Sequence, residues 1–429
     1  MSGESSVSRI YDAVVVGGGP AGATAAAELA AAGRSVVLLD REGRVKPCGG
    51  AVPPQLLRDF DVPETLLVNR VDTARILSPR GRAVDIPVGE GFVGMVDRDT
   101  FDEWLRCRAA RFGAIRKRGR FRRIERDGSG ILSVHYTTPT SSSVATTMPM
   151  TAGSASDAND VSDEPGGGAE LVLRTRSVVG ADGALSQVAQ QEIPGADSIM
   201  DRIVFAYHEI VESPVAAGGE SFAPARADVY YDSRLSPDFY AWIFPHGETI
   251  SVGTGTCQKG FGIRDAVSQL RTRTGLDASR TIRKEGAPIP LKPLKRWDNG
   301  RDVILAGDAA GVVAPSSGEG IFYAMTGGRL AARSVDEFLE TGKASALRRA
   351  RRRFLLQHGQ VFFALGIMQR FWYANDQRRE RFVAICADRD VQQLTFDGYM
   401  NKRLVRSRPL AHARIFFKNI GHLTGLVPS

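Results

Sequence analysis

Short apolar runs separated by glycines open the chain and predict a strand, a helix and a second strand. The β-branched run 11–16 (YDAVVV) stops at three consecutive glycines, and the Ala-rich stretch 20–32 has helical character. Gly33 ends this helix, and residues 35–40 (SVVLLD) have the continuous hydrophobicity of a buried strand. Because a helical crossover joins parallel strands, the first 40 residues predict half of a mononucleotide-binding fold.

The central part of the chain follows a different pattern. Residues 71–96 alternate short apolar runs with Gly and Pro, which predicts strands, and residues 97–112 resume the periodicity of a helix. Residues 203–256 are rich in Val, Tyr, Phe, Trp and Thr with turn residues between them, which predicts an antiparallel sheet. The run 303–306 (VILA) predicts a further buried strand, followed after Gly318 by a helix to about residue 340.

These changes of pattern divide the chain into four parts. A discontinuous nucleotide-binding domain is predicted to comprise residues 1–70, 97–136, 170–195 and 296–343, and an antiparallel-sheet substrate domain to comprise residues 71–96 and 196–295. Residues 137–169 are rich in Ser, Thr and Gly and hold almost no large apolar side chain, so we expect a flexible insert. Residues 344–429 are predicted to form a basic helical C-terminal region.

The charge of the chain is concentrated at its C-terminal end. Of 56 basic and 48 acidic residues, 17 basic and 5 acidic ones lie between Lys343 and Ser429, and the rest of the chain is slightly acidic. A basic helix with aromatic neighbours suits an anionic membrane surface, although a solvated basic face packed on the core has the same composition. Nucleic acid is not an expected partner, because no recognition motif accompanies the charge.

Cysteine spacing and the N-terminal segment indicate where the protein is located. The four cysteines are scattered without a CxxC pair, so neither a zinc site nor a disulfide framework is expected, and we predict no metal site. The first residues hold no apolar signal core, and no stretch reaches the roughly 18 to 20 apolar residues of a membrane-spanning helix. We expect a cytoplasmic protein with at most peripheral membrane contact, as a monomer or a small homo-oligomer.

A glycine motif lies between the first predicted strand and helix. Gly17, Gly19 and Gly22 give GxGxxG, and Asp40 ends the second strand 18 residues after Gly22. The first glycine permits the tight turn, the second lets a pyrophosphate approach the backbone, and the third lets helix and strand pack closely. The helix N-terminus offers N–H groups to the pyrophosphate, and Asp40 would hold a ribose hydroxyl. This context predicts a dinucleotide, and a merely Gly-rich turn is the alternative.

Two later motifs decide between FAD and NAD. Residues 307–310 (GDAA) follow the strand VILA, and residues 180–183 (GADG) lie in the middle of the chain. Both resemble fingerprints of flavoprotein reductases and hydroxylases, a resemblance that implies contact of Asp308 with the flavin ribityl chain. Asp308 and Asp182 are alternatively ordinary turn or cap residues. The expected fold class is α/β with an α+β second domain: a Rossmann-type FAD-binding domain with a parallel sheet, an antiparallel-sheet substrate domain and a helical C-terminal region.

Three further segments narrow the family. Residues 46–53 (KPCGGAVP), 237–245 (PDFYAWIFP) and 315–321 (PSSGEGI) resemble the geranylgeranyl reductase family over about residues 8–340. The resemblance implies an FAD-dependent reductase that saturates double bonds of a geranylgeranyl chain on (bacterio)chlorophyll or on geranylgeranyl diphosphate. It implies NADPH as a transient reductant, because a second GxGxxG is missing, with ferredoxin as the alternative. A pigment substrate would place the protein on the cytoplasmic face of a photosynthetic membrane.

The motifs supply the candidate cofactor-binding residues. They are Gly17, Gly19, Pro20, Ala21, Gly22, Asp40, Arg41, Cys48, Gly49, Gly50, Arg98, Asp182, Gly307, Asp308, Gly318, Gly320 and Ile321.

Alkene reduction needs a hydride at one carbon and a proton at the other, in a dry and apolar site. Cys48, flanked by Pro47 and two glycines, is a candidate proton donor, with a buried inert cysteine as the alternative. Glu319 is the competing acid. Arg98 resembles an arginine that approaches FAD in related flavoproteins, and a surface ion pair is its alternative role.

Three aromatic residues are candidates for substrate binding. Tyr240, Trp242 and Phe244 share one face if residues 237–245 form a strand, because alternate side chains point the same way. They would line an apolar tunnel beside the flavin, and ordinary core aromatics of a sheet are the compatible alternative.

Two other functions remain open from the sequence. One is a flavin monooxygenase of the aromatic hydroxylase type, although Gly311-Val312-Val313 stands where such enzymes typically place His and Pro-Pro, and the WxWxIP of flavin halogenases is absent. The other is an electron-transfer flavoprotein that reduces a quinone, which the scattered cysteines disfavour because they suggest no iron–sulfur site.

Overall fold

The computed structural model describes residues 9–41, 46–88, 91–138, 168–214, 223–392 and 402. Its first layer is a five-stranded parallel sheet in the order β19-β13-β2-β3-β9. The strands are β2 (Ala13–Val16), β3 (Val36–Asp40), β9 (Ile115–Arg118), β13 (Val178–Gly180) and β19 (Val303–Leu305). The predicted strands 11–16 and 35–40 are adjacent in this Rossmann-type sheet, the predicted strand 303–306 belongs to the same sheet beyond β13, and the fold class is confirmed.

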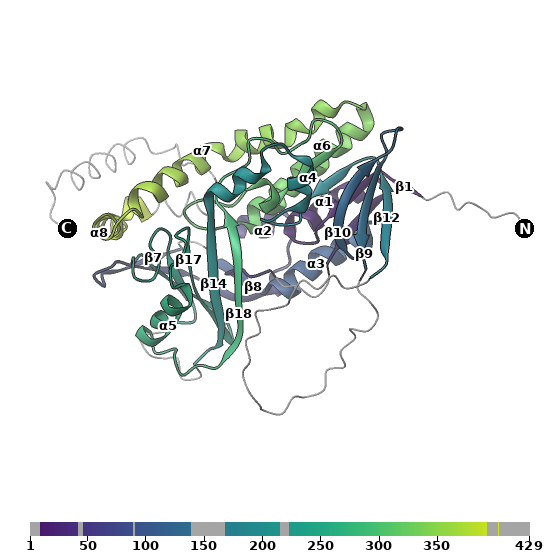
Figure 1. Cartoon of the computed structure of the whole chain (residues 1–429). Helices are drawn as coiled ribbons and strands as arrows, with labels where there is room; N and C mark the ends of the chain where they lie inside the picture. The colour runs from purple at the N-terminus through teal and green to yellow at the C-terminus, as the bar shows by residue number, and fades with distance from the viewer. Residues whose placement is uncertain are drawn as a thin grey trace, which may run out of the picture.

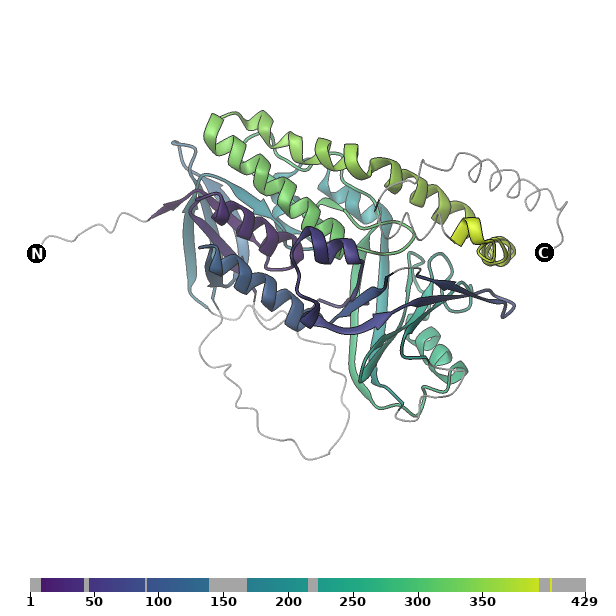
Figure 2. The same cartoon turned by 180° about the vertical axis from the view of Figure 1, so that it is seen from behind.

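Helices pack against this sheet and against each other (Figures 1 and 2). They are α1 (Pro20–Ala31), α3 (Arg98–Arg111) and α6 (Ile321–Thr341), where sequence periodicity predicts helices, together with the short α2 (Pro54–Asp59) and α4 (Gln187–Glu192). The helices α1 and α6 approach each other closely, because both have small residues at the contact. A Cβ added at Gly328 of α6 would lie 2.2 Å from the carbonyl oxygen of Ala21 in α1. A four-stranded sheet in the order β1-β12-β11-β10 adjoins the parallel one, formed by Ile10–Tyr11, Glu170–Thr175, Leu132–Thr137 and Arg120–Arg126.

The second large layer is a seven-stranded sheet in the order β18-β14-β17-β16-β15-β6-β7. Its strands are β6 (Thr73–Leu77), β7 (Ala83–Pro87), β14 (Ile203–Glu212), β15 (Arg226–Tyr230), β16 (Ala241–His246), β17 (Thr249–Thr256) and β18 (Thr281–Pro290). All neighbours are antiparallel except β6 and β15, which pair in parallel. The predicted antiparallel sheet is therefore mixed at this one pair, because β6 enters it from the N-terminal part of the chain. α5 (Ile263–Arg273) packs against β14 and β17.

A small three-stranded sheet lies at the junction of the two large layers. It consists of β4 (Ala51–Val52), β8 (Val93–Val96) and β5 (Leu67–Val71) in the order β4-β8-β5. Short 3₁₀ turns at Glu64–Leu66, Ala196–Arg202, Gly307–Ala310 and Ala344–Ala346 complete the connections. The predicted flexible insert 137–169 lies almost entirely outside the described residues, and the exact domain boundaries stay a prediction.

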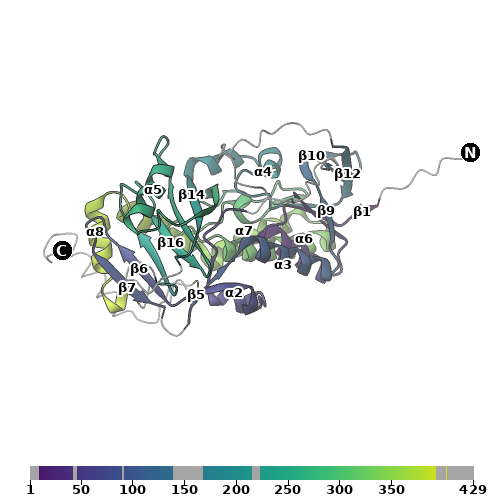
Figure 3. The ribbon, with the colours of Figure 1, turned by 90° about the horizontal axis from the view of Figure 1, so that it is seen from below.

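The C-terminal helices close the structure. α7 (Arg348–Trp372) packs along α6, and α8 (Asp376–Ile385) lies beside β7 of the second sheet (Figures 2 and 3). The predicted helical C-terminal region is confirmed over α7 and α8, which span both layers, and most of residues 393–429 lie outside the described residues. Among the residues that the structure describes, none of the helices is both long and apolar enough to cross a membrane.

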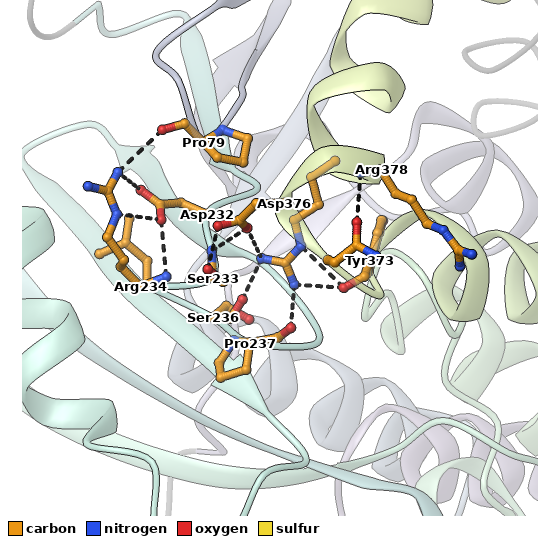
Figure 4. Close-up of polar contacts among 12 residues, drawn as sticks. Pro79, Asp232, Ser233, Arg234, Ser236, Pro237, Tyr373, Asp376 and Arg378 are labelled. Carbon is orange, nitrogen blue, oxygen red and sulfur yellow. Dashed lines mark hydrogen bonds and ion pairs between the residues drawn. The ribbon is translucent and has the colours of Figure 1, made fainter. Parts of the chain in front are cut away.

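Arg379 ties α8 to the loop before β16. Its guanidinium is fully buried and donates to the carbonyl oxygens of Ser236 at 2.6 Å, Pro237 at 2.6 Å and Tyr373 at 3.0 and 3.2 Å. Asp376 accepts from the backbone N–H and hydroxyl of Ser233 on the same loop, as Figure 4 shows. The C-terminal helices therefore fix the loop that leads into the aromatic strand.

The substitution Arg379→Met should destabilise the folded protein by about 3 kcal/mol, because it leaves three buried carbonyl groups without their donor. Thermal unfolding of the purified protein measures the change. Arg378→Met is the matched control, since the Arg378 guanidinium stacks at 4.4 Å on Phe371 in a partly exposed position. Equal melting temperatures for the two variants would contradict the anchoring role of Arg379.

Candidate functional site

A single cavity of about 920 Å³ runs from the parallel sheet to the seven-stranded sheet. The carboxyl ends of β2 and β3 open into it, which is where α/β sheets hold their ligands. Most of the predicted cofactor-binding, catalytic and substrate-binding residues contribute to its lining; only Gly22 and Gly307 do not. Nearly all the candidates that the sequence scatters over 300 positions thus surround one space.

The glycine turn has the geometry that a dinucleotide requires. Gly17 adopts a φ of +105°, and a Cβ there would lie 2.4 Å from the carbonyl oxygen of Ala181. A Cβ at Gly22 would lie 1.8 Å from the carbonyl oxygen of Gly17, which explains why Gly22 serves packing and stays out of the lining. A Cβ at Gly19 would meet no atom within 4 Å, and α1 begins there without a side-chain cap. The first N–H groups of α1 therefore face open space.

Asp40 lies beside this turn, and its surroundings add a residue that the motifs do not indicate. The Arg106 guanidinium on α3 approaches the Asp40 carboxylate at 3.6 Å and the carbonyl oxygen of Gly18 at 3.4 Å. Arg106 also lines the cavity. No sequence motif could single it out, because its position depends on the packing of α3.

The GDAA motif meets the cavity from the opposite strand. Gly307 has a φ of +65°, and a Cβ there would lie 2.6 Å from the Ala21 side chain, so this glycine serves the contact with α1. Asp308 is nearly buried and forms an ion pair with Lys46. Gly320 precedes α6, which has no side-chain cap, and Gly318 adopts a φ of +65°. A second uncapped helix N-terminus thus lies at the cavity beside Asp308.

Asp182 behaves mainly as a cap. Its carboxylate accepts hydrogen bonds from the Ser186 hydroxyl at 2.5 Å and from the N–H groups of Gln187 at 2.7 Å and Val188 at 3.2 Å. Burial raises the pKa of Asp182 above its usual range, against these hydrogen bonds, which lower it. The cap that the sequence left as an alternative therefore accounts for its contacts, although Asp182 also lines the cavity.

Cys48 and Arg98 face each other inside the cavity. The Cys48 thiol is half-buried and accepts the N–H of Gly50 at 3.4 Å. The Arg98 guanidinium is buried and donates to the Asp102 carboxylate at 2.7 and 2.9 Å. Burial alone would lower the pKa of Arg98, but the charge of Asp102 raises it above its ordinary value. Arg98 is thus a permanent buried cation beside the thiol, and its ion pair is internal rather than on the surface.

Glu319 is the second titratable candidate. It is buried and pairs with the Lys402 ammonium, while its Oε1 atom has no hydrogen-bond partner. Burial raises the pKa of Glu319, and the charge of Lys402 opposes this rise. The Lys402 ammonium also lies over the rings of Phe322 and Tyr323, at 5.6 and 5.8 Å from their centroids. Only the tertiary structure shows this pairing, since Lys402 is 83 residues away along the chain.

The aromatic candidates form one wall. Tyr240 lies immediately before β16, and the Trp242 and Phe244 side chains follow it on the same face. The Trp242 ring centroid lies 5.9 Å from that of Tyr240 and 6.0 Å from that of Phe244. The Tyr240 hydroxyl donates to the carbonyl oxygen of Ser317 at 2.5 Å, and the Trp242 indole N–H donates to Ser251 at 3.0 Å. Both polar tips are satisfied, so the rings present apolar surface to the cavity.

The rest of this end of the cavity is apolar as well. It is lined by small and branched side chains of the seven-stranded sheet and of α7: Ala74, Ile76, Ala206, Ala227, Val229, Ala287, Ile289, Val361, Ala364, Leu365 and Met368. Sequence reasoning assigned α7 a basic surface and missed its role as a cavity wall. The apolar spacing 361, 364, 365, 368 in that helix is the signal that could have indicated it.

The cavity therefore has two chemically different ends. One end offers two uncapped helix N-termini, a glycine turn and Asp40, which fit a pyrophosphate and a ribose. The other end is apolar and aromatic, which fits a hydrocarbon chain. Cys48 lies where the two ends meet, because a Cβ on its neighbour Gly49 would lie 3.0 Å from the Phe244 ring of the aromatic wall, and both Cys48 and Arg98 line the cavity.

Comparison with known proteins adds independent findings. Residues 11–109 match the family model of pyridine nucleotide-disulphide oxidoreductases. The chain is 52% identical to geranylgeranyl diphosphate reductase of Rhodobacter capsulatus over 97% of this chain and 98% of that protein. A geranylgeranyl bacteriochlorophyll reductase-like protein of Thermoplasma acidophilum has a similar structure, with a TM-score of 0.74 at 19% identity, covering 94% of this chain and 99% of that one. p-Nitrophenol 4-monooxygenase of Pseudomonas putida is also similar, with a TM-score of 0.64 at 15% identity, covering 93% of this chain and 100% of that one. The fold alone therefore does not separate reductases from monooxygenases. The 52% sequence identity to the reductase separates them.

Proposed function

The chain belongs to the geranylgeranyl diphosphate reductase family, and on this premise we propose that its cavity holds FAD beside a geranylgeranyl chain whose double bonds it saturates with NADPH as reductant. The observation that carries the proposal is the continuity of the cavity from the glycine turn to the aromatic wall. The substrate is a (bacterio)chlorophyll ester or geranylgeranyl diphosphate, since both carry the same chain.

The residues at the polar end fit the dinucleotide. The N-terminus of α1 would hold the pyrophosphate, Asp40 a ribose hydroxyl, and Asp308 with the N-terminus of α6 the ribityl end. When bound and reduced, FAD supplies a hydride equivalent to an alkene carbon. The sequence holds no second GxGxxG, so NADPH would bind only transiently.

The protein's own contribution is to hold the chain, exclude water and deliver a proton. Trp242, Phe244 and the small side chains of the sheet orient the isoprenoid in a dry space, where no carbonyl stabilises developing charge. The Cys48 Sγ–H donates its proton to the second alkene carbon. The positive charge of Arg98, held in place by Asp102, stabilises the thiolate that remains until solvent protons restore it. Glu319 is the competing donor, from the α6 side of the cavity.

Anaerobic incubation of the FAD-loaded protein with NADPH tests the function. Geranylgeranylated bacteriochlorophyll and geranylgeranyl diphosphate are supplied in separate reactions, and mass spectrometry measures the prenyl chain. Mass gains in steps of two hydrogens are expected with at least one of the two substrates, and the faster substrate identifies the natural carrier. Flavin bleaching without mass gain on either would reject the reductase and favour the electron-transfer alternative. Oxygen uptake coupled to hydroxylation of an aromatic would favour the monooxygenase.

The outer face of α7 supports a peripheral membrane location. Leu356 and Phe363 are 74% and 72% exposed, and Ile367 continues the same helical face. Arg348 and Arg352 are exposed at the N-terminal end of the same helix. An apolar stripe that begins beside exposed arginines fits the surface of an anionic bilayer, and the opposite face of α7 lines the cavity. We propose that α7 rests on the membrane that holds the substrate.

Co-sedimentation with vesicles checks this location. The wild-type protein should bind vesicles that contain anionic phosphatidylglycerol, and the double substitution Leu356→Glu/Phe363→Glu should weaken binding at least about tenfold, because two apolar contacts are lost. Gln357→Glu, an exposed position off the stripe, is the control for added negative charge. Unchanged sedimentation of the double variant would show that α7 does not contact the bilayer.

A further inference from the structure

His246, the last residue of β16, reaches the loop that carries Cys48. Its Nε2 atom lies 3.1 Å from the carbonyl oxygen of Gly49, and its Nδ1 atom lies 3.3 Å from the Asp97 carboxylate. The ring is 7% exposed. Asp97 lies between β8 and α3 and directly precedes Arg98, the first residue of α3. One short segment therefore supplies both the partner of His246 and the cation beside Cys48.

The contact with the loop fixes one hydrogen on the ring. A carbonyl oxygen only accepts hydrogen bonds, so the Nε2 atom carries the hydrogen that it donates to Gly49. The Nδ1 atom is buried without a hydrogen-bond partner and faces the Asp97 carboxylate at 3.3 Å. The nearby His246 ring also affects Asp97. It is the largest cause that lowers the pKa of Asp97, and burial opposes this lowering.

The loop is seated directly on β16 and β8. Gly50 has a φ of +69°, and a Cβ there would lie 2.4 Å from the carbonyl oxygen of Val96 and 2.6 Å from the His246 ring. A Cβ at Gly49 would lie 3.0 Å from the Phe244 ring. The carbonyl oxygen of Gly50 accepts the N–H of Val96 at 2.9 Å. The two glycines of the PCGG element are thus required by the side chains of β16 and, at Gly50, by the Val96 carbonyl oxygen.

We propose that His246 is a positioning residue, which holds the 48–50 loop through the Gly49 carbonyl and so fixes the Cys48 thiol against Arg98. The seven-stranded sheet thereby determines where the Cys48 thiol lies. Phe244 of β16 packs under the 48–50 loop, and His246, two residues further along the same face of the strand, binds the backbone of that loop. The inference rests on the proposed catalytic role of Cys48, but its structural part has a separate measurement.

The separate measurement is the alkylation rate of Cys48 in the FAD-loaded protein. Iodoacetamide labelling resolved by peptide mass spectrometry follows Cys48, with the exposed Cys257 as internal reference. His246→Leu removes the donor to the Gly49 carbonyl and should release the loop, so that Cys48 reacts about tenfold faster while Cys257 is unchanged. His246→Gln keeps an amide donor for the Gly49 carbonyl and should return the rate to within about threefold of wild type.

Turnover provides the second readout. His246→Leu should lower kcat for prenyl reduction about tenfold with little change in KM, and His246→Gln should recover most of it. Asp97→Asn changes a half-exposed carboxylate and serves as the second variant if His246→Leu loses its FAD. It should also raise the alkylation rate of Cys48 and lower kcat. An unchanged or slower Cys48 alkylation in both His246→Leu and Asp97→Asn would overturn the proposal. If the variants show faster Cys48 alkylation but the wild-type protein shows no prenyl reduction, the positioning role of His246 stands and the proposed function is rejected.

Discussion

Replacement of Cys48 by alanine is expected to lower kcat for reduction of the geranylgeranyl chain by about 10²- to 10⁴-fold, the usual contribution of a positioned proton donor. The protein should remain yellow, because Cys48 is only one of many residues at the cofactor end of the cavity. Arg98 keeps its ion pair with Asp102 in this variant, so the buried cation is not left unpaired. Absorbance spectra measure FAD content, and anaerobic turnover measures the rate.

Two further variants make this result specific to the thiol. Cys48→Ser keeps the size of the side chain but offers a much weaker acid, so it should stay close to Cys48→Ala in rate. Cys257→Ala changes an exposed cysteine and should leave turnover unchanged. Full activity in Cys48→Ala would remove the thiol from the mechanism and leave Glu319 as the donor, which Glu319→Gln would then test.

The second large effect concerns the glycine turn, where two glycines separate cofactor binding from folding. Gly19→Ala should fold normally, because Gly19 has a φ of −73° that alanine adopts freely and its Cβ would meet no protein atom within 4 Å. With the pyrophosphate at this turn as proposed, the added methyl group would meet it, and FAD affinity should fall about 10- to 100-fold, as for the loss of one or two hydrogen bonds. Fluorescence titration of the apoprotein with FAD measures this change.

Gly22→Ala is the contrasting variant. Its Cβ would lie 1.8 Å from the carbonyl oxygen of Gly17, so the helix and strand must separate, at a cost of about 3 kcal/mol or more. Thermal unfolding should therefore show a loss for Gly22→Ala and none for Gly19→Ala. Normal FAD affinity in Gly19→Ala would place the pyrophosphate elsewhere in the cavity.

The sequence was sufficient to predict those features that depend on local pattern. The strand–helix–strand unit around Gly17 and the late strand before Asp308 follow from hydrophobic periodicity and turn chemistry, and the structure places them in one parallel sheet. The alternation of Tyr240, Trp242 and Phe244 likewise predicted a shared face. Their place on a cavity wall is a property of the folded chain.

Residues that act through long-range packing could not be predicted. Arg106 reaches Asp40 only because α3 lies beside the glycine turn, and Lys402 reaches Glu319 from the far end of the chain. Asp182 combines both roles that the sequence left open, since its hydrogen bonds cap α4 while it also lines the cavity, and its contact with a cofactor stays a prediction. Charge composition indicated the basic side of α7 and concealed the apolar side that faces the cavity.

The interleaved strand order of the parallel sheet has a consequence for biosynthesis. β2 ends at Val16, yet β13 separates it from β19, which begins at Val303. At about 5 to 20 residues per second, a ribosome needs roughly 15 to 60 s to make the chain between them. The glycine turn therefore exists in the nascent chain long before Ala181 packs behind it or Asp308 joins it across the cavity. Binding of the proposed FAD would therefore require near-complete translation, so stalled or truncated chains should accumulate without colour.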